Sequence, residues 1–137
     1  MSSQPTAAAS ERTVVMIVAA HAILRNAIYE SLLLMQPDWE HVEVQGAEQA
    51  LALVAAREID IALVDAGVAT EDAEQTVRAI KAAAPRVEIV VLTDSADPVE
   101  PAACQSAGAS ACVRKRNLFA ELEPLLPALK LLAARRS

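Results

Sequence analysis

Five short apolar runs alternate with helical stretches along this chain, and no other feature constrains its fold as strongly. The stretches between the runs place apolar residues at three- and four-residue spacings, as amphipathic helices do. Strands that alternate with helices pair in parallel through right-handed crossovers. The pattern predicts an α/β fold, with a doubly wound five-stranded parallel sheet in a three-layer sandwich. The expected strands are residues 14–18, 42–44, 59–64, 87–92 and 111–113, and the first three helices are residues 22–35, 47–56 and 71–84.

Prolines and one capping sequence indicate where the helices begin and end. Pro37 and Pro85 follow the first and third helices, which a proline cannot continue. Asp97 is expected to cap a fourth helix, because the sequence Asp-Pro-Val-Glu supplies a cap, a first-turn proline and a capping-box acid. The last helix, within residues 118–134, contains two prolines, so we expect it to start late or to kink.

Composition limits the class of protein. The 137 residues suit one domain, which we place at 13–134, after a disordered lead-in of residues 1–12 rich in Ser, Ala and Pro. A net charge of −6 and only one Trp, one Tyr and one Phe argue against nucleic acid as a partner. No apolar run approaches the roughly 18 residues of a membrane span, and no leader opens the chain. A cytoplasmic protein with reduced cysteines and no membrane contact is therefore predicted.

Three polar residues end three different predicted strands. Asp65 follows the third strand, Thr93 the fourth and Lys115 the fifth. In a doubly wound sheet, ligands and chemistry lie at the carboxyl ends of the strands, beside the point where strand order reverses. The three residues together therefore predict a functional site at that edge.

With these residues in place, residues 13 to 132 resemble the receiver domain of bacterial response regulators, which has the flavodoxin-like fold. The resemblance implies that Asp65 is the phospho-accepting position, Thr93 the strand-four hydroxyl and Lys115 the strand-five lysine. The stretch 107–109, Ala-Gly-Ala, is also similar to the family. The stretch 20–25, Ala-His-Ala-Ile-Leu-Arg, looks like receivers that are joined to a helix-turn-helix output domain, which we do not expect in this protein. We therefore expect a stand-alone receiver in two-component signalling.

The clearest departure from that family lies after the first strand. Receivers of the usual type have two acids where this chain has Ala19 and Ala20, and the acids help to hold a magnesium ion. Magnesium needs carboxylate anchors, and here Asp65 and the backbone carbonyl of Gly67 would remain. The ion also neutralises charge on the transferring phosphoryl group. We therefore expect no metal cofactor, and slow or absent magnesium-dependent phosphorylation.

Two further departures concern the switch that the resemblance implies. The loop 66–73 lacks the family's Met-Pro-Gly pattern. Cys112 stands where many receivers have an aromatic side chain that couples to the strand-four hydroxyl, and a small thiol cannot act as that lever. Thr93 has either a switching role or the ordinary structural role of a β-branched residue in a strand. Cys112 is either a redox sensor or a small buried residue.

The Asp65–Lys115 pair has three interpretations. It satisfies a buried acid, or it locks one signalling conformation without phosphate, or it serves a phosphorylation that survives with a weaker metal site.

The leading function is a degenerate receiver that binds a signalling protein through the fourth helix, fifth strand and fifth helix. Alternatives are a true phosphorelay receiver, phosphorylated on Asp65 by a histidine kinase, and a pseudo-receiver that binds an anionic small molecule. A second copy of the chain is a further candidate partner.

Other site types have little support in the sequence. His21 and His41 are the only histidines, and neither has a cysteine or acid at metal-ligand spacing. Asp94 is expected to face solvent. No Ser-His-Asp arrangement or glycine-rich phosphate loop is present, so an enzyme is not predicted.

Overall fold

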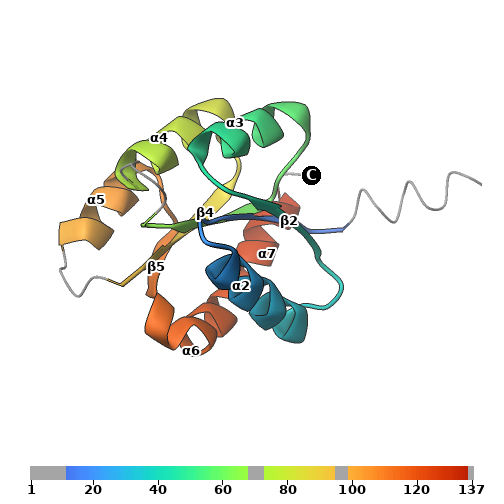
Figure 1. The fold of residues 1–137 in the computed structure, drawn as a ribbon. Coiled ribbons are helices and arrows are strands. Elements are labelled where there is room, and N and C mark those ends of the chain that lie inside the picture. Colours follow the sequence, from blue (N-terminus) through green and yellow to red (C-terminus); the bar gives the residue numbers. More distant parts are fainter. Residues whose placement is uncertain (1–11, 68–72, 95–98, 136–137) are drawn as a thin grey trace, which may run out of the picture.

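The computed structural model describes residues 12–67, 73–94 and 99–135, which form one sheet covered by helices on both faces (Figure 1). The predicted lead-in, apart from Arg12, lies outside the described residues. So do the expected start of the third helix at Glu71 and the expected cap at Asp97. The strands are β1 (Val14–Val18), β2 (Glu40–Val44), β3 (Ile61–Asp65), β4 (Glu88–Thr93) and β5 (Ala111–Arg114). The helices are α2 (Ala22–Met35), α3 (Ala47–Ala56), α4 (Ala73–Ala83), α5 (Val99–Ala107), α6 (Leu118–Leu122) and α7 (Leu126–Arg135).

The sheet has the order β2-β1-β3-β4-β5, and every pair of neighbouring strands is parallel. Strand order reverses at β1, because β2 lies on one side of it and β3 on the other. The predicted doubly wound sheet is confirmed. Strand β2 begins two residues earlier than expected, at Glu40, because it pairs with β1 from Val14 onward.

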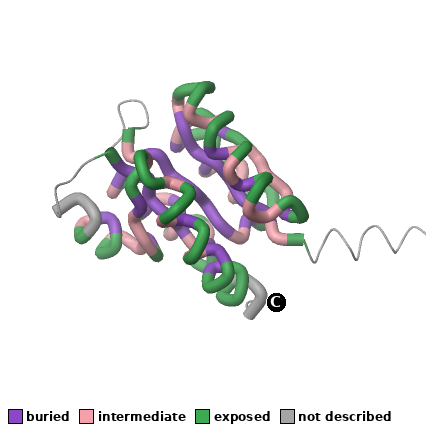
Figure 2. Tube along the Cα trace, turned by 90° about the horizontal axis from the view of Figure 1, so that it is seen from below, coloured by how far each residue is buried: buried purple, intermediate pink, exposed green. Residues whose placement is uncertain are grey.

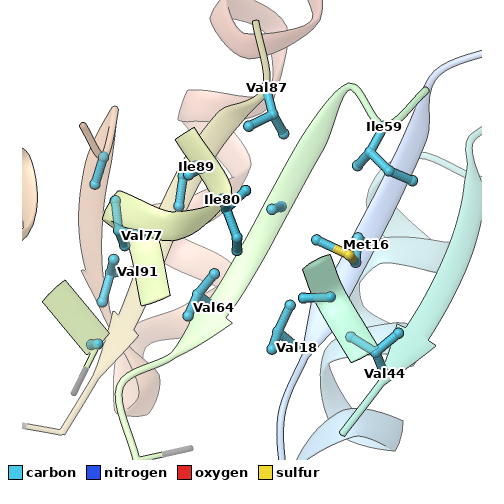
Figure 3. Close-up of a cluster of buried hydrophobic side chains, with 14 of the residues drawn as sticks. Met16, Val18, Val44, Ile59, Val64, Val77, Ile80, Val87, Ile89 and Val91 are labelled. Carbon is cyan, nitrogen blue, oxygen red and sulfur yellow. The ribbon is translucent and has the colours of Figure 1, made fainter. Parts of the chain in front are cut away.

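Successive residues of the central strands enter two different cores. The central strands are buried along most of their length (Figure 2). Met16 and Val18 of β1 face the first core, which α3, α4 and α5 cover (Figure 3). Val15 and Ile17 face the second core, which α2, α6 and α7 cover. A sheet buried on both faces needs apolar residues at consecutive positions, so its strands read as uninterrupted apolar runs.

The predicted last helix is interrupted. Its residues form a 3-10 turn, η1 (Lys115–Asn117), then α6, a second 3-10 turn, η2 (Glu123–Leu125), and α7. Pro124 lies inside η2 and Pro127 in the first turn of α7, which agrees with the expected kink. Leu122 and Leu126 on either side of η2 are both fully buried, so the segment stays on the sheet across the break.

Polar side chains at the amino edge of the sheet bind backbone groups. The Asp60 carboxylate accepts a hydrogen bond from the Val14 amide at 2.8 Å. The Lys81 ammonium donates to the carbonyls of Pro85 and Val87, at 3.1 and 2.6 Å. Gly108 packs against the Lys81 side chain. Its φ is 124°, a backbone angle that residues with a side chain rarely adopt. These contacts lie where β1, β4 and β5 begin. Among the described residues, no helix is long and apolar enough to cross a membrane.

Candidate functional site

The ends of three adjacent strands bring the predicted site residues to one edge of the sheet. Asp65 is the last residue of β3 and Thr93 the last of β4. Strand β5 ends at Arg114, so Lys115 is the first residue of η1 rather than part of the strand. Parallel pairing of β3 with β4, and of β4 with β5, places all three residues at the carboxyl edge. This is the edge at which the sequence predicted the site.

Asp65 is the most buried charged residue of this edge. Its side chain is 1% exposed, and its Oδ1 contacts the Lys115 ammonium and accepts a hydrogen bond from the Gly67 amide at 3.1 Å. The cation and the backbone donor stabilise an ionised carboxylate that water cannot reach. Asp65 and Lys115 therefore form a buried ion pair that joins the end of β3 to the segment after β5.

Lys115 also contacts a second carboxylate, which sequence reasoning missed. Asp94 follows Thr93 directly, and its Oδ2 lies 3.4 Å from the Lys115 ammonium. The Asp94 side chain is 79% exposed, as expected, but it also forms an ion pair with Lys115. Its place one residue beyond β4, opposite the residue after β5, was the signal that could have found it. One ammonium thus links the ends of β3, β4 and β5.

The surroundings of Lys115 shift its pKa upward. Burial alone would lower the pKa of the ammonium, because it disfavours the charged form. The hydrogen bond and negative charge of Asp65, with a smaller contribution from Asp94, outweigh burial and hold the pKa above its usual value. Lys115 therefore remains a cation throughout the neutral range.

The end of β1 is built differently. Ala19 is fully buried and Ala20 partly buried, and neither side chain has a polar atom. The Arg25 guanidinium, from the first turn of α2, donates to the carbonyl of Ala19 at 2.9 Å and of Ala20 at 3.2 Å. Arg25 also lies 3.5 Å from the Glu43 carboxylate of β2. Arg25 was noted in the sequence only as part of a family-like stretch, and this contact was not foreseen.

The other predicted positions border the same edge. Thr93 is buried, and Cys112 is partly buried against the first core rather than fully buried. Gly67 is exposed, and an added Cβ there would lie 3.7 Å from Asp65 Oδ2, an ordinary contact. The described residues include no group of three or more His, Cys, Asp or Glu side chains that could hold a metal ion.

The two histidines lie apart from this site. His21 is exposed just before α2, whereas His41 lies within β2. The His41 ring meets the Tyr29 ring edge to face, with centroids 5.3 Å apart, and its buried Nε2 has no hydrogen-bond partner among the described residues. Burial lowers the pKa of His41, although the charge of Glu43 opposes that shift. His41 is therefore a packed strand residue.

Comparison with known proteins identifies the family. Residues 15–126 match the model of the response regulator receiver domain. A chain of the Salmonella typhimurium RcsB response regulator aligns with a TM-score of 0.79 at 20% identity, covering 88% of this chain and 60% of that chain. A LuxR-family two-component response regulator from Aurantimonas sp. SI85-9A1 aligns with a TM-score of 0.78 at 25% identity, covering 88% and 86%. A CheY-like receiver domain from Methanospirillum hungatei JF-1 aligns with a TM-score of 0.72 at 16% identity, covering 87% and 97%. No curated protein matches.

The chain belongs to the response regulator receiver domain family of two-component signalling, because the family match spans most of its length. The flavodoxin-like architecture expected from the sequence is confirmed. Receiver domains are in general signalling modules without enzymatic activity, and they interact with kinases and other signalling proteins. The chain spans 60% of the RcsB chain, whose remaining length has no counterpart in this match.

Proposed function

We propose that this chain is a degenerate receiver, which acts through protein contact and does not depend on phosphorylation of Asp65. The proposal rests on the contacts that the oxygen atoms at the carboxyl edge already make with the protein's own cations. The Asp65 carboxylate is held by Lys115, and the carbonyls of Ala19 and Ala20 are held by Arg25. Side chains of the protein itself supply cations at both halves of the edge.

A magnesium ion fits this edge poorly. Magnesium takes an octahedron of oxygen ligands, keeps several waters and is anchored by carboxylates. Positions 19 and 20 supply none, and the second carboxylate of the site, Asp94, lies beside the Lys115 ammonium. An incoming ion would have to compete with Lys115 for Asp65, and the two cations would repel each other. We therefore derive no phosphoryl transfer through a metal.

The linked carboxylates support a locked conformation. Lys115 joins the segment after β5 to the ends of β3 and β4, so a shift of β5 or η1 would disrupt contacts to both Asp65 and Asp94. Because Asp65 is buried, loss of its partner would leave an uncompensated charge. Thr93 then contributes to packing at the end of β4, and Cys112 does not act as a lever.

A partner is expected on the face formed by α5, β5 and the last helical segment, α6 with α7. Residues just after β5 connect the locked ion pair directly to α6 through η1. A signalling protein bound there would contact the segment that the lock holds in place. A histidine kinase is the expected partner only if Asp65 accepts phosphate, which is the alternative function.

The test is an amide NMR titration with magnesium, followed by beryllofluoride, which mimics a phosphoryl group on an aspartate. The wild-type chain is compared with the double variant Ala19→Asp, Ala20→Asp, which restores the two acids. We expect no saturable shifts around Asp65, Thr93 and Lys115 in the wild type. The double variant should show saturable shifts with magnesium, which proves that the assay can detect binding at this edge.

Saturable wild-type shifts that spread from Asp65 to β5 and α6 would overturn the proposal in favour of the phosphorelay alternative. A thermal-shift screen against anionic metabolites tests the small-molecule alternative, because a ligand that binds only the folded state raises the melting temperature. If no metabolite changes the melting temperature, that result agrees with the proposed function.

A further inference from the structure

We infer that the partner docks through an acidic segment with an apolar anchor, on a basic corner defined by Arg114, Arg116 and Phe119. This inference rests on the proposed function, because it names the chemistry of the partner for the same face. All three side chains are exposed, and they lie within six consecutive residues at the end of β5, in η1 and at the start of α6. They flank Lys115, so a partner on this corner lies beside the ion pairs of the site.

Among the described residues, the guanidiniums of the basic corner have no acidic partner, unlike those of Arg25, Arg57 and Arg78. Arg25 pairs with Glu43, Arg57 with Glu40 at 2.9 Å and Arg78 with Glu74 at 3.0 Å. Among the described residues, no carboxylate lies within ion-pair distance of Arg114 or Arg116. A planar guanidinium binds a carboxylate through two parallel hydrogen bonds, and this capacity is unused at both positions.

Two carboxylates of this region, those of Glu121 and Asp94, are engaged by other donors. Glu121 of α6 accepts a hydrogen bond from the Arg114 backbone amide at 2.9 Å and from the Asn117 side chain at 3.3 Å. Asp94 lies beside Lys115. The charge of Lys115 is matched by two carboxylates, whereas Arg114 and Arg116 are exposed and have no carboxylate partner among the described residues. In a chain with a net charge of −6, such a corner selects for a negatively charged partner.

Phe119 supplies the apolar part of the corner. It is the only Phe in the chain, and 43% of it is exposed although the second core lies beneath α6. Arginine and aromatic side chains are enriched among the residues that dominate protein–protein affinity, and charged neighbours around an aromatic anchor set orientation. The matching segment therefore has carboxylates that reach the two guanidiniums and an apolar side chain that covers the Phe119 ring.

The test uses three probes with the full chain in an amide NMR titration. The first is a synthetic peptide of glutamate and leucine at helical spacing. The second has the same leucines with lysine in place of glutamate, and the third is oligodeoxythymidylate. We expect saturable shifts at Arg114, Arg116 and Phe119 with the acidic peptide alone. The double variant Arg114→Gln, Arg116→Gln should weaken its binding by about tenfold or more.

Two variants sharpen the result. Phe119→Ala should weaken the acidic peptide by about fivefold while leaving its salt dependence unchanged, because it removes apolar contact and no charge. Arg12→Gln is the matched control, since Arg12 is exposed at the opposite edge of the sheet, just before β1, and carries the same charge. Binding by Arg12→Gln should equal that of the wild type. All variants are compared only if their spectra show the dispersion of the folded chain.

Three results would overturn the inference: equal binding of the acidic and lysine peptides, stronger binding of the oligonucleotide, or shifts that avoid the basic corner. Repeating the titration with magnesium and beryllofluoride separates this inference from the proposed function. Binding of the acidic peptide only in the presence of beryllofluoride would support the basic corner and refute phosphorylation independence. Silence towards the peptide, together with silence towards beryllofluoride, would refute the basic corner alone.

Discussion

Several charged side chains at the two edges of the sheet have different kinds of partner. At the amino edge, Asp60 and Lys81 bind backbone groups, although Glu40 and Arg57 form an ion pair there on the surface. At the carboxyl edge, Asp65 and Asp94 meet Lys115, so each charge depends on another side chain from a different strand. A backbone partner stays in place as long as the turn is folded, whereas a side-chain partner can be exchanged for a ligand or a protein. From this difference we expect the amino edge to be structural and the carboxyl edge to be functional.

The β1 end of the carboxyl edge breaks this division. Arg25 binds the carbonyls of Ala19 and Ala20, as Lys81 binds those of Pro85 and Val87. At the point where receivers of the usual type have acids, the protein is therefore built like its own amino edge. If the two edges, and the two halves of the carboxyl edge, differ in energy as they differ in geometry, substitutions in each should change stability by different amounts.

The largest expected effect is that of Lys115→Met. The substitution leaves the Asp65 carboxylate buried without its cation, and breaking one partner of a buried pair costs about 3 to 5 kcal/mol. Urea unfolding of the wild type and the variant measures the loss. In the Lys115→Met background, Asp65→Asn should recover most of it, because no buried charge is then left. A loss below about 1 kcal/mol for Lys115→Met would show that Asp65 is readily neutralised or solvated.

Glycines at the two edges should respond differently to alanine. Gly108→Ala at the amino edge places a Cβ 2.7 Å from Lys81 Cγ on a backbone with φ of 124°. We expect a loss of about 2 kcal/mol, because both strain and overlap must be relieved. Gly67→Ala at the carboxyl edge is the matched control: its added Cβ makes ordinary contacts, so the loss should stay within about 0.5 kcal/mol. Equal losses would contradict the assignment of strain to the amino edge.

Arg25→Met tests whether the β1 end is structural. It removes the donor to two carbonyls, and we expect a loss of about 1.5 kcal/mol in the free energy of urea unfolding. Lys81→Met removes an equivalent pair of bonds at the amino edge and should cost a similar amount. Arg25→Met could instead leave the free energy of unfolding unchanged, or magnesium could cause saturable amide NMR shifts at Asp65 in this variant. Either result would show that Arg25 controls access to the site and does not stabilise the backbone.

Most of the fold followed from the sequence because the signals were redundant. The runs at 14–18 and 87–92 are apolar at nearly every position, which only a strand buried on both faces requires. Proline ended the helices where expected. The start of β2 was misjudged because Glu40 and His41 lie on an edge strand, where polar residues obscure the pattern. The form of the kink at η2 depends on packing beneath Leu122 and Leu126, which local sequence does not encode.

The site was only partly predictable, for a different reason. Asp65, Thr93 and Lys115 end strands, and parallel topology alone brings strand ends together. The contacts of Asp94 and Arg25 depend on side-chain direction in the turns after β4 and β1. The sequence gives no period from which that direction can be read. Both residues add contacts to the edge, since Asp94 is a second carboxylate beside Lys115 and Arg25 binds the carbonyls of Ala19 and Ala20.

The smallest expected effect concerns His41, whose Nε2 has neither a backbone nor a side-chain partner among the described residues. Burial lowers the pKa of His41 in the folded state, while the unfolded chain keeps a value near about 6.5. Above that pH both states are neutral and the contribution to stability is complete. As the pH falls below it, the unfolded chain binds the proton more readily, so stability declines until the folded pKa is reached.

The melting temperature of the wild type should therefore fall between about pH 7 and pH 5, and the fall should be smaller in His41→Phe, which keeps the ring contact with Tyr29. His21→Phe, which changes the exposed histidine, is the control and should retain the wild-type slope. An unchanged slope in His41→Phe would assign the acid sensitivity to the ion pairs of the two edges rather than to this unpaired ring.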